Sequence, residues 1–510
     1  MFLAHITIAK SGEIRKLSSI EVTFTDYSFM LYVQRLVKTL DGLGEQNMRR
    51  IGLGTSACAI FIVLALSACT HVQQYRTNYE LCMSHTPTPL PECETHTLQQ
   101  YQDAVNPDRG YLLGFVEFDD QGLLFDNRKQ MKVVVDRLKD EVEKKDLLII
   151  AFMHGWKHSA APGDDNIKTF REVLMSLSEA ENHISKIIGE PTSEIAGVYL
   201  GWRGDSLTVP LLKELTFWER KNTAQKVGHA GVTEVLNRLE RIKQDKDSTV
   251  EGGSRTRFIV VGHSFGGAAV YAALSQILES GFVRTVGPKG VQSDVVGFGD
   301  LVILINPAFE ALLFAPMSDM STERDSYSKS QLPVLAVLTS EADDATKLAF
   351  PVGRRFSTFF EKEGDTGRWN ATTRQDEIID VEKANITAVG HFEPYKTHYL
   401  RATEPRREER AISTTGVKSA QVFVRTSEAW EQDQPGSKIT FDDSVLERTN
   451  SSAGRNPYLV VRVDGKLIEN HNDIADPRII EFIKQLILIS SQSPKQKEAR
   501  EKIRIESQLQ

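Results

Sequence analysis

Short apolar runs alternate with longer amphipathic segments over residues 147–338. Each run has the length of one strand and is nearly continuous, which is typical of strands buried on both faces of a parallel sheet. Strands that alternate with helices in this way predict a doubly wound, mostly parallel α/β sheet. The predicted strands are 147–152, 195–202, 258–261, 300–306 and 333–338, and the predicted helices are 127–144, 172–188 and 211–243.

The same pattern sets the limits of the domain. Residues 111–125 contain two β-like runs around the sequence DDQG, which predicts a hairpin. Strand-like residues at 459–468 precede an amphipathic segment, 476–489, that begins with Asp and Pro and is expected to be a helix. We expect one domain over 111–490, with a tether of little regular structure at 70–110 before it and a polar tail at 491–510 after it.

The strand at 258–261 leads into the sequence GHSFGG at 262–267 and then into an alanine-rich helical segment. In the pattern G-x-S-x-G the glycines leave room for a sharp strand-to-helix turn, which lifts the serine above the sheet. Ser264 is therefore a candidate nucleophile. The N–H of Phe265, at the start of the helix, would point to the place where an acyl oxyanion forms. A glycine-rich turn with an ordinary serine is the alternative interpretation.

The strand at 147–152 ends in the sequence MHGW at 153–156. Directly after a central strand, His154 and Gly155 resemble the oxyanion loop of α/β-hydrolases, in which a flexible glycine lets the next N–H, here that of Trp156, turn into the site. His154 and His158 are also four residues apart, but a metal pair would need a helix through Gly155 and a third ligand. Neither is evident, so we expect no metal and no cofactor.

The chain resembles the α/β-hydrolase superfamily over residues 111–489, and within it uncharacterised bacterial lipase-like or esterase-like lipoproteins. The resemblance rests on F-x-H-G-W at 152–156, on GHSFGG at 262–267 and on HNDI at 471–474. It implies the α/β-hydrolase fold and a serine hydrolase whose triad follows in the order Ser, acid, His. None of these motifs specifies a substrate.

The acid of the implied triad is expected in the loop after the strand 333–338. Asp343 is preferred because this loop resembles the pattern Ser-x-x-Asp-x-Ala-Thr of bacterial hydrolases. Asp344 and Glu341 lie in the same loop and are the alternatives. The triad acid orients the base and offsets the positive charge that the base acquires.

The base is expected between the last strand and the last helix, and His471 lies there. His391 and His398 are the alternatives. Both stand in the segment 347–456, which separates the acid loop from the last strand. In the family this gap is usually short, so we expect an insertion that acts as a cap over the site, with a strand at 420–425.

A different signal lies near the N-terminus. The sequence MRR at 48–50 is followed by an uncharged stretch at 51–68 and by LSAC at 66–69, a pattern typical of a secretory signal. Export signals act from the N-terminus, so we interpret Met48 as the start and 1–47 as an over-extended N-terminus. An internal membrane anchor is the alternative, for which the stretch is only just long enough.

The ending LSAC resembles a bacterial lipobox, which implies that Cys69 is lipidated and tethers the protein to a membrane. Thr70 after this cysteine implies, by the same resemblance, the outer membrane of the cell envelope. Cys82 and Cys93 flank a proline-rich loop, and in an oxidising compartment we expect them to form a disulfide, with two free thiols as the alternative.

Net charge and composition limit which classes of partner the protein can be expected to bind. The 510 residues carry a net charge of -8 and no basic patch interleaved with aromatic residues, which argues against a nucleic-acid partner. The motifs together predict hydrolysis of a carboxylic ester, either a small molecule or a lipid, through an acyl-enzyme on Ser264. The alternative is a non-enzymatic envelope lipoprotein that uses the same scaffold for binding.

Overall fold

A computed structural model describes residues 73–86, 90–106, 109–204, 215–251, 253–286, 292–351, 364–403, 416–474 and 476–490. The chain divides into two units, Met1–Thr70 and His71–Gln510, and every described residue belongs to the second. The predictions for 1–47, for the signal at 48–69 with Cys69, and for the tail at 491–510 therefore lie outside the described residues. Among the helices that are described, none has both the length and the hydropathy that a membrane span requires.

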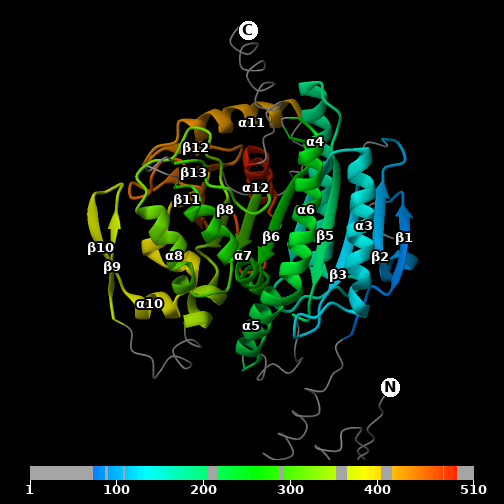
Figure 1. Ribbon diagram of the computed structural model, residues 1–510, viewed down its shortest axis with the longest axis horizontal. Helices are drawn as coiled ribbons and strands as arrows, with labels where there is room; N and C mark the ends of the chain where they lie inside the picture. Colours follow the sequence, from blue (N-terminus) through cyan, green and yellow to red (C-terminus); the bar gives the residue numbers. More distant parts are fainter. Residues whose placement is uncertain are drawn as a thin grey trace, which may run out of the picture. The chain divides into compact units, whose positions relative to one another are not determined.

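A mostly parallel 12-stranded sheet forms the centre of the domain (Figure 1). Its strands follow the spatial order β1-β2-β3-β5-β4-β6-β7-β8-β14-β11-β13-β12. From β3 to β11 all neighbours are parallel, and antiparallel pairs occur only toward the two edges. The strands of this sheet are β1 Asn78–Ser84, β2 His96–Gln102, β3 Gly110–Glu117, β4 Leu147–Met153, β5 Glu194–Gly201, β6 Arg257–His263, β7 Leu301–Ile305, β8 Leu335–Ser340, β11 His398–Ala402, β12 Lys438–Thr440, β13 Ser444–Arg448 and β14 Tyr458–Val463.

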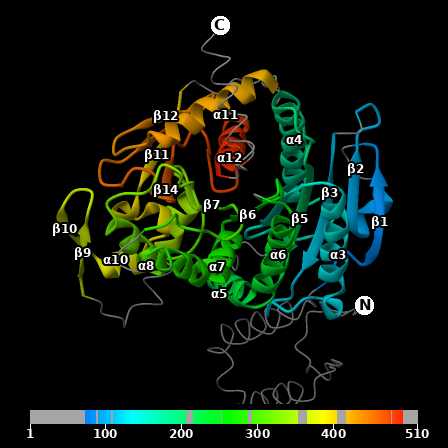
Figure 2. The same cartoon turned by 45° about the horizontal axis from the view of Figure 1, so that its top comes forward.

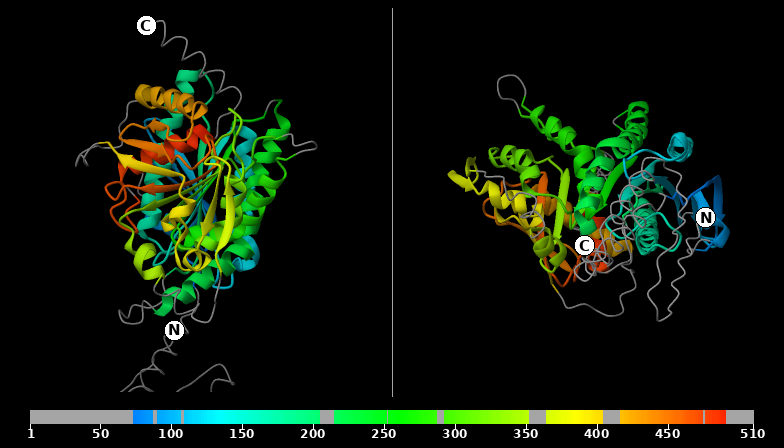
Figure 3. Two further views of the ribbon diagram at one scale, coloured as in Figure 1. Left: turned by 90° about the vertical axis from the view of Figure 1, so that its left-hand side faces the viewer. Right: turned by 90° about the horizontal axis from the view of Figure 1, so that it is seen from below.

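Helices cover both faces of the sheet, as the left-hand view in Figure 3 shows. Alternate residues of β6 face opposite cores: Phe258 and Val260 lie in one, Ile259 and Val261 in the other. The first core includes residues of α3 Lys129–Lys144, α5 Leu215–Val227, α6 Thr233–Thr249, α7 Phe265–Val283, α8 Ala311–Thr322 and α10 Val381–Ile386. The second includes residues of α4 Asp165–Ile188, α11 Gly416–Glu431 and α12 Pro477–Ser490, which lie near one another in Figure 2. The predicted α/β class with a mostly parallel sheet is thus confirmed.

The segment 70–110 is not the tether that we expected. It contains β1 and β2, and β2 pairs with β3, so this segment forms one edge of the main sheet. Cys82 of β1 and Cys93 form a disulfide across this edge. Sequence analysis missed these strands because their burial is uneven, with polar residues spread through both, and because β1 is only half-buried.

One further local prediction held only in part, and another was wrong. The chain does reverse over 111–125, with an antiparallel bridge between Phe118 and Leu124 and a hydrogen bond from the N–H of Asp119 to the carbonyl oxygen of Leu123, but only β3 is a full strand. The strand predicted at 420–425 lies within helix α11. Val422 and Phe423 are buried in α11, which packs against the helices α4 and α12, and this tertiary packing overrides their β propensity.

Within the insertion at 347–456, for which we expected a cap, the described residues include three strands that extend the main sheet. In its described part, β11 pairs with β14, and β13 and β12 follow at the edge. A separate hairpin of β9 Thr366–Asn370 and β10 Gln375–Ile379 projects beside α8 and α10 (Figure 1). The turn η7 Val389–His391 returns to the main sheet and packs against β8 and β14.

Candidate active site

Ser264 stands on a strained turn at the carboxyl end of β6. Its backbone has φ 55° and ψ -121°, an unfavourable conformation for a residue with a side chain. A Cβ on Gly262 would lie 2.7 Å from the Cα of Gly267, and a Cβ on Gly266 would lie 2.2 Å from the carbonyl oxygen of Met153. The glycines are therefore required because β4, β6 and α7 approach one another so closely behind the serine.

Ser264, His471 and Asp343 form a line of hydrogen bonds. The Oγ of Ser264 is 2.6 Å from Nε2 of His471, and Nδ1 of His471 is 2.9 Å from Oδ1 of Asp343. An ionised carboxylate only accepts hydrogen bonds, so Nδ1 donates to it and Nε2 is left to accept the serine proton. The three residues come from the loops after β6, β14 and β8, which all end at the same edge of the sheet.

Asp343 is buried and its carboxylate is well supplied with donors. Besides His471, it accepts hydrogen bonds from the N–H groups of Ala345 (3.1 Å) and Thr346 (3.2 Å) and from the Thr346 hydroxyl. Burial opposes ionisation, but the hydrogen bonds from His471 and Thr346 outweigh it and lower the pKa of Asp343. The carboxylate is therefore ionised at neutral pH.

The alternative acids and bases lie elsewhere. Asp344 is exposed, and Glu341 forms an ion pair with Arg401 at 3.1 Å. His398 is buried in β11, separated from β6 in the sheet by β7, β8 and β14. His391 lies closer to Asp343, because its Nε2 is 2.9 Å from the hydroxyl oxygen of Thr346, which itself donates to the Asp343 carboxylate.

Two side chains that sequence analysis missed hold the backbone of His471. The carbonyl oxygen of His471 accepts from Nδ2 of Asn306 at 3.0 Å and from Nε2 of His263 at 2.9 Å. Burial lowers the pKa of His263 to about 3, so its ring is neutral and Nε2 carries the proton. The GHSFGG motif could have pointed to His263, which lies within it. For Asn306 the sequence offered only its position directly after the strand β7.

The loop after β4 lies against the serine. A Cβ on Gly155 would be 2.6 Å from the Cβ of Ser264, so this position must be glycine for the loop to approach. His154 is buried, donates from Nδ1 to the carbonyl oxygen of Gly155 at 2.9 Å and accepts the N–H of Trp202 at Nε2 at 3.1 Å. The C=O and N–H of a trans peptide point in opposite directions, so this bond directs the N–H of Trp156 away from His154.

Three further residues near the serine are held by packing or hydrogen bonds: Trp202, His158 and Phe265. Trp202 is buried and stacks on His154, and its Nε1 donates to the carbonyl oxygen of His154 at 2.9 Å. His158 is 3.1 Å from the carboxylate of Asp164 through Nδ1, and its ring lies edge-on to that of His154. Phe265 is the first residue of α7, with its side chain buried. In the part of the chain that the structure describes, no cluster of three or more His, Cys, Asp or Glu side chains is arranged to hold a metal ion.

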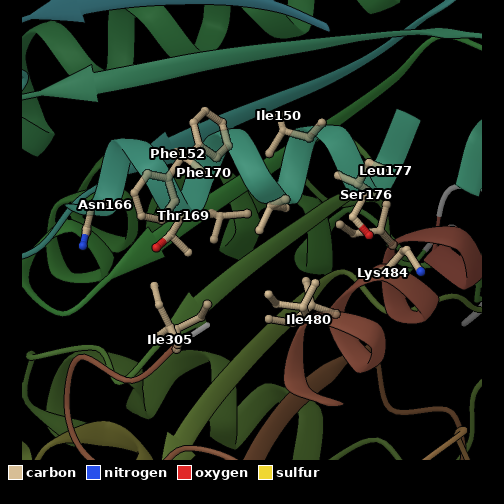
Figure 4. Close-up of a pocket in the computed structure, with 15 residues that line it drawn as sticks. Ile150, Phe152, Asn166, Thr169, Phe170, Ser176, Leu177, Ile305, Ile480 and Lys484 are labelled. Atoms are coloured by element: carbon tan, nitrogen blue, oxygen red, sulfur yellow. The ribbon is translucent and has the colours of Figure 1, made fainter. Parts of the chain in front are cut away.

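An apolar cavity lies between α4, α12 and the sheet (Figure 4). Its volume is about 60 Å³, and its walls include Phe152, Phe170, Ile305 and Ile480. Ser264, His471 and Asp343 are not among its lining residues. The cavity thus belongs to the packing of two helices on the sheet beneath the His471 loop.

Comparison of the chain with protein-family models, with curated proteins and with solved structures found no significant match.

Proposed function

We propose that this protein is a serine hydrolase of the α/β-hydrolase superfamily that cleaves a carboxylic ester. The observation that carries the proposal is the line from Ser264 through His471 to Asp343 at one edge of the sheet. The positive φ of the serine supports it, since the strained turn after β6 exposes Oγ to a base in the manner of a nucleophile elbow. The chain order of the three residues is Ser, acid, His, as in that superfamily.

The order of the strands gives independent support for the superfamily. From β3 to β14 the sheet runs β3-β5-β4-β6-β7-β8-β14. β4 and β5 stand in reversed order, β6, β7 and β8 follow in chain order, and β14 takes the place beside β8 after the chain has formed β11, β12 and β13 beyond it. The serine follows the central strand β6, the acid follows β8, and the histidine lies between β14 and α12. Ligands in open α/β sheets bind at the carboxyl ends of the strands, where these three loops meet.

The proposed reaction is acyl transfer to water. Nε2 of His471 takes the proton of Ser264 while Oγ forms a bond to the ester carbonyl carbon. His471 then gives that proton to the leaving alcohol oxygen, whose bond to carbon breaks, and an acyl-enzyme remains. In the second half His471 takes a proton from water while the water oxygen bonds to the acyl carbon. The bond from that carbon to Oγ then breaks, the proton returns to Oγ, and the carboxylic acid product is released. Asp343 holds the histidine in the tautomer that accepts at Nε2.

The negative charge that develops on the carbonyl oxygen would be stabilised by the N–H groups of Phe265 and Trp156. Phe265 begins α7 directly after the nucleophile, where the helix dipole favours negative charge. The Gly155 loop lies against Ser264, and the bond from His154 to the Gly155 carbonyl fixes the orientation of the peptide that carries the Trp156 N–H. The chain's own residues are sufficient for this mechanism.

We also propose that the protein acts in the cell envelope, tethered through a lipid on Cys69. The disulfide between Cys82 and Cys93 supports an oxidising compartment. The substrate class that fits this location is a small-molecule or lipid ester.

Labelling with a fluorophosphonate probe tests the proposed function on the purified full chain. We expect the wild type to be labelled and both Ser264→Ala and His471→Ala to lose labelling. Both variants should unfold at the same midpoint as the wild type, to within the spread seen among variants of exposed residues. Hydrolysis of a series of p-nitrophenyl esters would then establish the ester class. A folded wild type that is not labelled would refute the proposal and favour a binding protein on the same scaffold.

A further inference from the structure

The carboxylate of Asp343 receives side-chain hydrogen bonds at both of its oxygens. His471 donates to Oδ1, which also accepts the N–H groups of Ala345 and Thr346, and the Thr346 hydroxyl donates to Oδ2. Because the hydroxyl has a single hydrogen and an ionised carboxylate only accepts, that hydrogen is committed to Asp343. Thr346 Oγ1 therefore acts as an acceptor toward its second neighbour, His391.

This commitment fixes the tautomer of His391. Its Nε2 is 2.9 Å from Thr346 Oγ1 and must carry the proton that is donated there. Burial lowers the pKa of His391 to about 4, so the ring is neutral at neutral pH and has only this one N–H. These side chains therefore donate toward Asp343 along two routes. His391 donates to Thr346, which donates to Asp343, and Ser264 donates to His471, which donates to Asp343.

The element that carries His391 is firmly attached to the sheet. In η7 the N–H of Val389 donates to the carbonyl oxygen of Phe309 at 3.0 Å. A Cβ on Gly390 would lie 1.8 Å from Oγ1 of Thr339 in β8, so the turn contacts that strand directly. The insertion therefore presents His391 from a turn that is hydrogen-bonded to the segment after β7 and in contact with β8.

We propose that Thr346 and His391 are positioning residues that hold the Asp343 carboxylate in the orientation in which it receives His471. The effect of these residues on catalysis rests on the proposed function. Their hydrogen bonds to Asp343 and to each other are independent of it. Asp343 has rotational freedom about its side-chain bonds, and fixing Oδ2 through Thr346 leaves Oδ1 directed at His471. The insertion at 347–456 would thereby contribute to the site through His391 without contacting the substrate.

The test combines two measurements on the full chain: the rate of fluorophosphonate labelling and the strongly downfield proton resonance of the His471 Nδ1–H. The resonance is assigned by its absence from His471→Ala. Thr346→Val removes the hydroxyl with little change in volume, and Thr346→Ser keeps it. We expect Thr346→Val to shift or abolish the resonance and to slow labelling about 10-fold to 100-fold, as small displacements of catalytic groups do, and Thr346→Ser to restore both.

His391 is tested in the same way with two variants and matched controls. We expect His391→Leu to change the resonance and slow labelling, and His391→Gln, which keeps a donor near the position of Nε2, to recover much of both. The controls are Thr426→Val and His398→Leu, which remove a buried hydroxyl in α11 and a buried imidazole in β11. They should leave the resonance and the labelling rate unchanged.

The two proposals fail in different ways. If Thr346→Val and His391→Leu fold but keep the wild-type resonance and labelling rate, the positioning role is refuted. The same holds if they lower stability without moving the resonance, since that is a structural effect alone. If the wild type is not labelled, the proposed function is refuted, and the resonance still reports whether Thr346 and His391 orient Asp343.

Discussion

Nδ2 of Asn306 donates a hydrogen bond to the carbonyl oxygen of His471 across 3.0 Å, while its Oδ1 accepts the N–H of Ser340 at 2.9 Å. Asn306 is buried directly after β7, with φ 44°, and its own N–H donates to the carbonyl oxygen of Leu338 in β8. One side chain thus joins the ends of two central strands to the loop that carries His471. That loop has no regular structure, so its position depends on such bonds.

Asn306→Asp should therefore displace His471. The carboxylate can still accept from Ser340, but it presents an acceptor, in place of a donor, to the His471 carbonyl. We expect the fluorophosphonate labelling rate of Ser264 to fall by about 10-fold to 100-fold. Asn237→Asp, at an exposed position of α6, is the matched control and should label at the wild-type rate. Equal rates in the two variants would contradict the role of Asn306.

Gly155→Ala should inactivate the site by steric contact. The added Cβ would lie 2.6 Å from the Cβ of Ser264 and 3.0 Å from the carbonyl oxygen of His263, so the loop after β4 or the serine must move. We expect loss of labelling by about 100-fold, measured as the rate with the same probe. Gly367→Ala is the control, because a Cβ there meets no atom within 4 Å. Normal labelling of Gly155→Ala would show that the loop does not need this close approach.

Removing the disulfide should lower stability without affecting the site. Cys82 and Cys93 are 11 residues apart in sequence, and closing a loop of this size contributes about 2–3 kcal/mol to the free energy of unfolding. They lie at the β1 edge of the sheet, with β2, β3, β5 and β4 between β1 and β6. We expect Cys82→Ala combined with Cys93→Ala to unfold at lower denaturant concentration and to label at the wild-type rate. A reduced wild-type sample should behave like this variant, and unchanged stability in both would count against the prediction.

Buried histidines should make the protein less stable in acid. Burial lowers the pKa of His154 and His391 to about 4 and of His263 to about 3, and lowers that of His398 well below its ordinary value. In the unfolded chain each titrates near 6.5, so between about pH 6.5 and pH 4 the unfolded state binds more protons. The free energy of unfolding then falls as the pH falls, by about 1.4 kcal/mol per pH unit for each histidine.

His398 allows this pH dependence to be measured away from the site. We expect denaturant unfolding of His398→Leu to show a shallower loss of stability from pH 6.5 to pH 5 than the wild type, by about 1.4 kcal/mol per pH unit. The comparison uses the slope of the unfolding free energy against pH. A loss of stability caused by the substitution itself is the same at every pH and leaves this slope unchanged. Identical slopes would mean that His398 is not held neutral by burial.

Much of the fold and of the candidate site follows from local sequence. The strands 147–152 and 258–261 are apolar runs whose side chains enter both cores, so their hydrophobicity alone marks them as central. The turn at 262–267 could also be predicted, because the strand, the two glycines of the turn and the helix follow one another directly in the sequence. Where the apolar pattern was weak, as in β1 and β2, the strands were missed: polar residues are spread through both, and it is the pairing of β1 with β2 and of β2 with β3 that makes them strands.

The sequence by itself determined that a serine turn follows a buried strand and that an acidic loop and a histidine follow later strands. Only the tertiary structure decided which histidine meets the serine, because His391, His398 and His471 all follow the acid loop and differ in the strand that brings them near it. It also brought Asn306 to the backbone of His471 and Thr346 to His391. Their hydrogen bonds join loops distant in sequence, and no local pattern encodes a contact that exists only when parallel strands end at one edge.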